Sequence, residues 1–157
     1  MSILSATGVS FEFKVPVLVI GAGACGLTAA LAARGQGEEV LVLERDAKPS
    51  GSTALSSGMI PACDTRFQRA RGIQDSPRNM AADIQKKARH RADPAVVQSV
   101  CEASGPAIEW LADEHGVNLH LVEGFLYPGH GVPRMHAPPS MTGQELMSGL
   151  LEAVGRT

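Results

Sequence analysis

Three glycines at a fixed spacing constrain this chain more than any other feature. Gly21, Gly23 and Gly26 form the pattern Gly-x-Gly-x-x-Gly. The apolar run 15–20 before them suits a fully buried strand, and the Ala- and Leu-rich run 27–34 after them suits a helix. The apolar residues Val-Leu-Val-Leu that follow at positions 40–43 predict a second buried strand. This order predicts a βαβ unit with parallel strands.

Each glycine has its own role in a dinucleotide-binding βαβ unit. Gly21 lets the chain turn sharply out of the strand, and Gly23 lets the backbone approach a pyrophosphate. Gly26 lets the helix pack closely on the sheet. The phosphates would lie at the helix N-terminus, where free N–H groups and the helix dipole favour negative charge.

Glu44 ends the second predicted strand. It lies close to the offset of roughly twenty residues at which an acidic side chain binds ribose hydroxyls. A carboxylate there argues against NADP, because it would repel the 2′-phosphate. The alternative is a glycine-rich βαβ unit with a chance surface glutamate.

Composition excludes several classes of partner. The chain has 157 residues, 44% of them hydrophobic, and a net charge of −2 with no run of basic residues. We expect one globular domain without nucleic-acid or membrane partners. The uncharged run 15–33 is about long enough to span a bilayer, but its three glycines argue against a membrane helix.

Cysteine and histidine usage indicates a reducing cytoplasm and no metal site. The three cysteines, Cys25, Cys63 and Cys101, form no Cys-x-x-Cys pattern. No His-x-x-x-His pair is present either. We expect Cys25 to pack as a small side chain. We expect His130 and His136 to be exposed or bonded to backbone.

Further signals organise the rest of the chain. Residues 1–14 are predicted to be a flexible arm, 48–61 a turn-rich stretch, and 127–140 a loop with four prolines. Ser76-Pro77 and Asp93-Pro94 each predict a helix start.

The first of these helices would reach about His90 and the second about His115, with a break or kink at Gly105-Pro106. The charged residues from Asp83 to Arg91 would form a solvated face of the first. Residues 117–122 suit a short strand. Thr142-Gly143-Gln144-Glu145 is a capping box that opens a last helix ending at Gly155.

The βαβ unit alone does not distinguish FAD from NAD. Residues 50–59 are small and hydroxyl-rich, with glycines where a backbone could pass close to a ligand. An ordinary flexible loop would have the same composition, so both interpretations stay open at this point.

A family resemblance favours FAD. Residues 17–27, 42–45 and 50–59 read Val-Leu-Val-Ile-Gly-Ala-Gly-Ala-Cys-Gly-Leu, Val-Leu-Glu-Arg and Ser-Gly-Ser-Thr-Ala-Leu-Ser-Ser-Gly-Met. They resemble the FAD-binding start of the fumarate reductase and succinate dehydrogenase flavoprotein family. The soluble branch, with flavocytochrome-type fumarate reductases and 3-ketosteroid dehydrogenases, is the nearest likeness. Further similar stretches lie at 75–77, 93–95, 108–111, 134–138 and 142–143.

The resemblance implies a set of FAD-contacting residues. Five residues would line the pyrophosphate: Gly21, Ala22, Gly23, Ala24 and Gly26. Glu44 would bind the adenosine ribose, and Arg45 would lie near the adenine. Six more would follow the pyrophosphate and flavin: Gly51, Ser52, Thr53, Ser56, Ser57 and Gly58. Ser50 departs from the family, which has the first glycine of a Gly-Gly pair there. This segment has no histidine, so FAD is expected to be non-covalent.

The resemblance also implies a fold and an activity. The fold would be an α/β, Rossmann-like FAD-binding domain over residues 15–157, with a parallel sheet incomplete at its C-terminal side and a helical insert at about 76–116. The enzyme would transfer hydride between flavin N5 and a C–C bond of an activated, dicarboxylate- or ketone-type substrate. Its partners would be that small molecule and the remainder of its own enzyme or an electron-transfer partner.

Family members are several hundred residues long. Their capping domain, their later Ala-Thr-Gly-Gly-type strand end and their catalytic arginine and histidine residues have no counterpart here, so no catalytic residue is assigned. We expect this chain alone to be inactive. Two alternatives stay open: an NAD-dependent dehydrogenase domain, which bound yellow flavin would exclude, and an inactive truncated or split module, which an exposed apolar sheet edge and self-association would favour.

Overall fold

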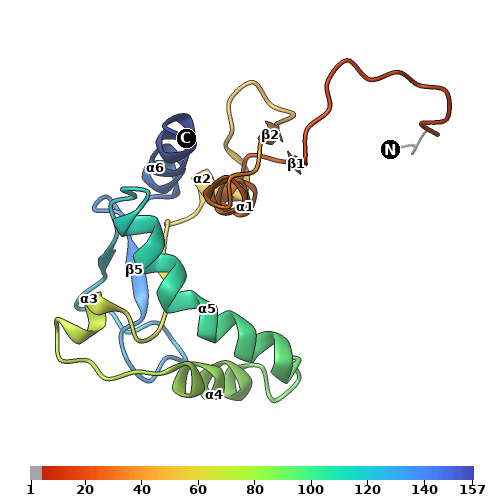
Figure 1. The fold of residues 1–157 in the computed structure, drawn as a ribbon. Coiled ribbons are helices and arrows are strands. Elements are labelled where there is room, and N and C mark those ends of the chain that lie inside the picture. The colour runs from red at the N-terminus through yellow and green to blue at the C-terminus, as the bar shows by residue number, and fades with distance from the viewer. Residues whose placement is uncertain (1–4) are drawn as a thin grey trace.

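The computed structural model describes residues 5–157, so the first four residues of the predicted arm lie outside the described part (Figure 1). Residues 5–14 form no helix or strand and lead away from the rest of the chain.

The βαβ unit is present as predicted. Strand β1 (Val17–Ile20) is followed by helix α1 (Ala24–Gly35) and strand β2 (Val40–Leu43). The strands pair in parallel, with Val17 opposite Val40. The fold is therefore α/β, with a parallel sheet at its start.

The two strands are not fully buried, which corrects the prediction. Their burial alternates, and Ile20 is 82% exposed. The cause is that α1 packs on the two-stranded sheet while no described element covers the exposed side chains, which are Leu18, Ile20, Leu41 and Leu43.

A second, antiparallel sheet was not predicted. It has the order β3-β5-β4, with β3 at Ile60–Pro61, β5 at Met135–Ala137 and β4 at His120–Leu121. Strand β5 lies within 127–140, so the prediction of a plain loop there was wrong. The strand forms because its backbone pairs with both distant neighbours, a cause that no local pattern reveals.

Two long helices begin at their predicted caps. Helix α4 (Pro77–Lys87) follows Ser76, whose side chain accepts from the Asn79 amide, and helix α5 (Pro94–Asp113) follows Asp93, which accepts from the Ala95 and Val96 amides. Helix α5 continues through Pro106, so the predicted break is absent. Two short helices, α2 (Gly51–Leu55) and α3 (Arg66–Arg69), were not predicted.

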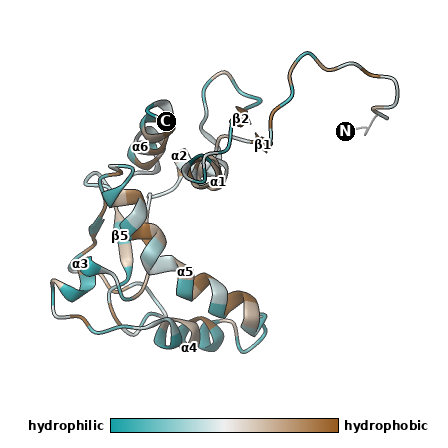
Figure 2. Cartoon of the chain, in the orientation of Figure 1, coloured by the Kyte–Doolittle hydropathy of each residue, from teal (hydrophilic) through white to brown (hydrophobic). Residues whose placement is uncertain are grey.

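The main core joins α1 and α5 to the last helix, α6 (Gly143–Gly155). Leu27, Leu31, Ile108, Leu146 and Leu150 are nearly inaccessible to solvent there. Figure 2 shows hydrophobic positions along α5, whereas α4 is mostly hydrophilic. Among residues 5–157, no helix is both long and apolar enough to cross a bilayer.

Candidate functional site

The glycine turn has the geometry that its sequence requires. Gly21 has a φ of 102°, which disfavours a side chain, and its amide donates to the Leu43 carbonyl at 2.7 Å. A Cβ on Gly26 would lie 1.9 Å from the Gly21 carbonyl oxygen. The turn therefore has no room for a side chain at the third glycine.

The N-terminus of α1 is open to an anion. Gly23 is the N-cap and has no side chain that could bond the first-turn amides, and that turn holds no acidic residue. Its N–H groups have no acceptor within the helix, and the helix dipole places partial positive charge there. Backbone amides and positive potential together suit a phosphate group.

Thr53 links the second glycine-containing segment to this turn. Its Oγ1 accepts from the Ala24 amide at 3.0 Å, although the two residues lie far apart in the sequence. A hydroxyl can accept one hydrogen bond and still donate its own proton. Thr53 can therefore order the turn and offer a donor to a ligand oxygen.

Helix α2 is held in place by the start of α6. The Gly143 amide donates to the Ser56 carbonyl at 2.8 Å. A Cβ on Gly143 would lie 1.8 Å from the Thr53 carbonyl oxygen, and one on Gly58 would lie 2.6 Å from the Thr142 carbonyl oxygen. The backbones therefore touch, and α6 fixes the position of Thr53. The cap at Thr142 was predicted from the sequence, whereas this role of Gly143 was not.

The predicted capping box is half formed. Thr142 Oγ1 accepts from the Glu145 amide at 3.3 Å. The Glu145 carboxylate instead accepts from the Ser140 amide at 2.7 Å, and the Ser140 side chain and backbone bonds lower its pKa.

Glu44 reaches back to the glycine turn. Its carboxylate accepts from the Ala22 amide at 2.8 Å and from the Asp46 amide at 3.1 Å. These backbone hydrogen bonds, that of Ala22 first, hold its pKa below the ordinary value. Glu44 is therefore ionised at neutral pH, beside the amides that would meet a nucleotide.

The structure brings part of the predicted set together. Ala22, Ala24, Glu44 and Thr53 are joined by direct hydrogen bonds, and the three motif glycines lie in the same turn. Six other predicted residues form no hydrogen bond with this turn in the described part of the chain: Arg45, Gly51, Ser52, Ser56, Ser57 and Gly58. Arg45 is exposed and pairs with Asp46 at 3.1 Å.

The arrangement fits the pyrophosphate and ribose of a dinucleotide. It combines a residue without a side chain at the N-cap, Gly23, an open helix N-terminus, a hydroxyl donor and an ionised carboxylate at the end of β2. Each of these features lies on this chain. The contacts of the individual residues with FAD stay predictions.

An apolar groove of about 710 Å³ begins beside this site. It starts at Ala24 and Cys25 and runs between α1 and α5, where small side chains leave space. Cys25 is exposed at its edge rather than packed, which corrects the expectation for it.

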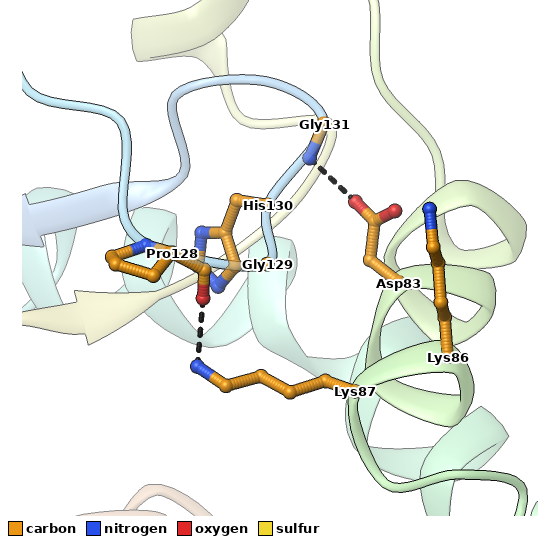
Figure 3. Close-up of a pocket in the computed structure, with 7 residues that line it drawn as sticks. All are labelled: Asp83, Lys86, Lys87, Pro128, Gly129, His130 and Gly131. Atoms are coloured by element: carbon orange, nitrogen blue, oxygen red, sulfur yellow. Dashed lines mark hydrogen bonds between the residues drawn. The ribbon is translucent and has the colours of Figure 1, made fainter.

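A separate, more polar pocket of about 490 Å³ lies between α4 and the loop before β5 (Figure 3). Lys87 Nζ donates to the Pro128 carbonyl at 2.7 Å, and Asp83 accepts from the Gly131 amide at 2.7 Å. His130 lines it, with a Nδ1 atom that is buried without a hydrogen-bond partner. None of the predicted cofactor residues lines this pocket.

A buried ion-pair network anchors the helical segment. The Arg134 guanidinium bonds Asp75 through two nitrogens at 2.6 and 2.9 Å and Asp83 at 2.6 Å. The Arg134 side chain is 2% exposed and the Asp75 side chain is fully buried. Burial raises the pKa of Asp83, but the bonds from Arg134 and Gly131 outweigh it and lower that pKa. Asp83 is thus not part of a solvated face, because it pairs with Arg134, which lies just before β5.

His136 extends this network. Its Nδ1 lies 2.9 Å from the Arg134 carbonyl, and its Nε2 lies 2.9 Å from Thr65 Oγ1. Burial lowers its pKa, so the ring is neutral, donates from Nδ1–H and accepts at Nε2. The prediction of an exposed or backbone-bonded ring is confirmed for His136 and is wrong for His130, which is half-buried and whose Nδ1 has no hydrogen-bond partner.

Comparison with known proteins places this geometry in a family. The model of the family described as FAD binding domain matches residues 16–154. Urocanate reductase of Eggerthella lenta is 37% identical over 133 residues, which are 85% of this chain and 22% of that protein. NADH:fumarate oxidoreductase of Klebsiella pneumoniae is 35% identical over 140 residues, which are 88% of this chain and 15% of that protein.

Solved structures agree. The open conformation of a flavocytochrome c3 fumarate reductase superposes with a TM-score of 0.85 at 27% identity, covering 96% of this chain and 27% of that one. The 3-ketosteroid-Δ4-(5α)-dehydrogenase of Rhodococcus jostii superposes with a TM-score of 0.79 at 28% identity, covering 97% of this chain and 38% of that one. The chain thus spans about a fifth of the curated relatives it matches. It belongs to the FAD binding domain family and resembles that domain in flavoprotein oxidoreductases of the fumarate reductase type.

Proposed function

We propose that this chain binds the pyrophosphate and adenosine ribose of FAD, non-covalently, as one part of a fumarate reductase-type enzyme. The observation that supports this most directly is the convergence of Glu44 and Thr53 on the glycine turn through the amides of Ala22 and Ala24. One side chain comes from the end of β2 and the other from α2, so two sequence segments meet where the phosphates would lie.

Each element of the site has a role in this proposal. The amides of Cys25 and Gly26 in the first turn of α1 and the Thr53 hydroxyl would donate to the pyrophosphate oxygens, while the Ala24 amide donates to Thr53. The Glu44 carboxylate accepts from the ribose hydroxyls, and Arg45 lies near the adenine. Residues 51–58 continue along the cofactor towards the flavin.

The relatives support an unsaturated carboxylate as the proposed substrate class. They include reductases of urocanate, fumarate and acrylate, all unsaturated carboxylates. FAD, when bound, would supply hydride transfer between its N5 and one carbon of an activated C–C bond. The residues of this chain bind and orient the cofactor, and we assign none of them to proton transfer.

Other parts complete the enzyme in this proposal. We propose that the chain alone does not turn over substrate and that it works with the remainder of its enzyme or with an electron-transfer partner. We place it in the cytoplasm, since Cys25, Cys63 and Cys101 are all free thiols. A catalytically inactive split module is the second candidate, supported by the uncovered side chains of the two-stranded sheet.

Titration of the purified chain with FAD, and with NAD as the competing ligand, tests the proposal. We expect saturable quenching of flavin fluorescence and no NAD binding. Gly26→Ala should abolish FAD binding because its Cβ would meet the Gly21 carbonyl, whereas Gly35→Ala in the same helix points into open space and should leave it intact. NAD binding, or equal affinity of both variants for FAD, would contradict the assignment.

Activity needs a separate assay. The FAD-loaded chain is supplied with a reduced viologen and fumarate or urocanate, and viologen oxidation is followed. We expect no turnover; turnover by this chain alone would show that a catalytic group lies on it.

A further inference from the structure

The arm that precedes β1 has the pattern of an amphipathic strand. Apolar residues Val9, Phe11, Phe13 and Val15 alternate with polar residues Ser10, Glu12 and Lys14. Alternation with a period of two is typical of a strand with one apolar face. These residues lie mostly within 1–14, which were predicted to be a flexible arm.

This pattern has no partner within the described residues. Residues 5–16 pair with no strand, and Phe13 is 79% exposed. Glu12 and Lys14 form no ion pair in this part of the chain. The arm thus presents an apolar face, two charges of opposite sign and unpaired backbone groups to solvent.

The two charges favour one antiparallel register between two copies of the arm, the register that places Glu12 opposite Lys14. With Phe13 opposite Phe13 of the second copy, Glu12 of each copy lies opposite Lys14 of the other, and Phe11 lies opposite Val15. A shift that centres the pairing on Glu12 places two carboxylates opposite each other, and a shift that centres it on Lys14 places two ammonium groups opposite each other. Directly opposed like charges destabilise a strand pair.

Pro16 fixes the hydrogen-bonding phase of this register. It lacks an amide N–H, so it cannot donate to a ladder. In the register centred on Phe13 it lies opposite Ser10, and an antiparallel ladder bonds only alternate pairs. The odd-numbered residues must therefore form the hydrogen-bonded pairs, with Phe13 bonded to its copy across the two-fold axis.

We propose that residues 10–16 pair antiparallel with the same residues of a second copy of this chain, with Phe13 on the two-fold axis. This pairing forms two cross-strand ion pairs on one face. On the other face it brings together Phe11, Phe13 and Val15 of both copies. The arm leads away from the FAD site, so the proposal does not rest on FAD binding.

Sedimentation velocity of the full chain over a wide concentration series tests this pairing. We expect a reversible monomer–dimer equilibrium. Glu12→Lys or Lys14→Glu alone should weaken the dimer about tenfold, because two attractive pairs become repulsive. The double variant should regain the original affinity. A mixture of the two single variants should form a heterodimer, in which every charged pair is again of opposite sign.

Matched control variants distinguish pairing of the arms from a general effect of net charge on self-association. Glu38→Lys and Lys48→Glu change exposed charges outside the arm and should leave the equilibrium unchanged. A chain that stays monomeric up to about 1 mM would overturn the proposal. So would self-association indifferent to the arm charges, which would point to the uncovered sheet face instead.

Crosslinking tests the register. In a Cys25→Ser background, Phe13→Cys should form a disulfide-linked dimer on oxidation by diamide, because it lies opposite itself. Phe11→Cys should not crosslink to itself but should crosslink to Val15→Cys in a mixture. Efficient self-crosslinking at position 11 and none at position 13 would contradict the register.

Discussion

The hydroxyl of Thr53 accepts a hydrogen bond from the Ala24 amide at 3.0 Å, and so joins helix α2 to the first turn of α1. Removing this hydroxyl should weaken FAD binding. Thr53→Val keeps the shape of the side chain but removes the hydroxyl that accepts from Ala24 and could donate to FAD. We therefore expect FAD affinity to fall about five- to tenfold. Thr53→Ser keeps the hydroxyl and should bind nearly as the original chain does. Fluorescence titration measures both; equal affinities of the two variants would show that the hydroxyl is not used.

Glu44→Gln should lower FAD affinity and remove its pH dependence in acid. The pKa of Glu44 lies below its ordinary value of 4.5, so the carboxylate remains ionised as pH falls until that lowered pKa is reached. FAD affinity of the original chain should be constant near neutral pH and decrease only in that acidic range. The FAD affinity of Glu44→Gln should be lower than that of the original chain and independent of pH. Titration with FAD at a series of pH values, all above the pH at which the chain unfolds in acid, measures both.

Gly143→Ala should destabilise the chain by about 2 kcal/mol or more, because its Cβ would overlap the Thr53 carbonyl. Gly149→Ala in the same helix meets only the Val117 side chain at an ordinary 3.5 Å. It should be neutral or stabilising by up to about 1 kcal/mol, since alanine favours helix. Urea unfolding compares the two; equal free energies of unfolding would contradict the contact between α6 and α2.

Arg134→Met should cost about 3–5 kcal/mol of stability, because it leaves the buried Asp75 carboxylate without its cation. Arg71 provides the control, since its ion pair with Glu123 is more than half exposed on both sides. Arg71→Met should change the free energy of unfolding by less than about 1 kcal/mol. If Arg134→Met lowers the free energy of unfolding only slightly, water must reach the Asp75 carboxylate in the folded chain.

Stability should fall as pH drops below about 6.5, the ordinary pKa of histidine. Burial lowers the pKa of His136 and of His130 in the folded chain, so the unfolded state takes up protons first. The stability that each neutral histidine contributes is complete above pH 6.5. As the pH falls from there to the folded pKa, each group lowers the free energy of unfolding by up to about 1.4 kcal/mol per pH unit. His136→Gln should show a shallower slope of unfolding free energy against pH; an unchanged slope would exclude His136.

Local patterns predicted the elements that local interactions specify. The βαβ unit follows from apolar runs and three glycines, and the starts of α4 and α5 follow from caps at Ser76 and Asp93. The ends were less predictable. Helix α5 passes Pro106 although proline removes one backbone bond, because the adjacent turns pack in the core through Ile108 and Leu111.

The missed elements depend on distant contacts. Helix α2 has poor helix formers at Gly51 and Ser52 and is held by the start of α6. Strand β5 exists because β3 and β4 pair with its two edges. Motifs therefore pointed to Glu44 and Thr53, which the structure brings to the glycine turn. The contact that positions Thr53 was not predicted, because Gly143 belongs to a helix with no nucleotide-binding pattern of its own.

The contact between α2 and α6 also orders events during synthesis on the ribosome. The glycine turn and Thr53 emerge early, but the backbone that holds Thr53 belongs to Gly143 and emerges much later. A nascent chain that has made the βαβ unit therefore lacks the contact that holds Thr53, in the second segment that we propose to bind phosphate. Cofactor capture should follow translation of α6 rather than accompany the first strands, and the early intermediate must keep its apolar strands from aggregating meanwhile.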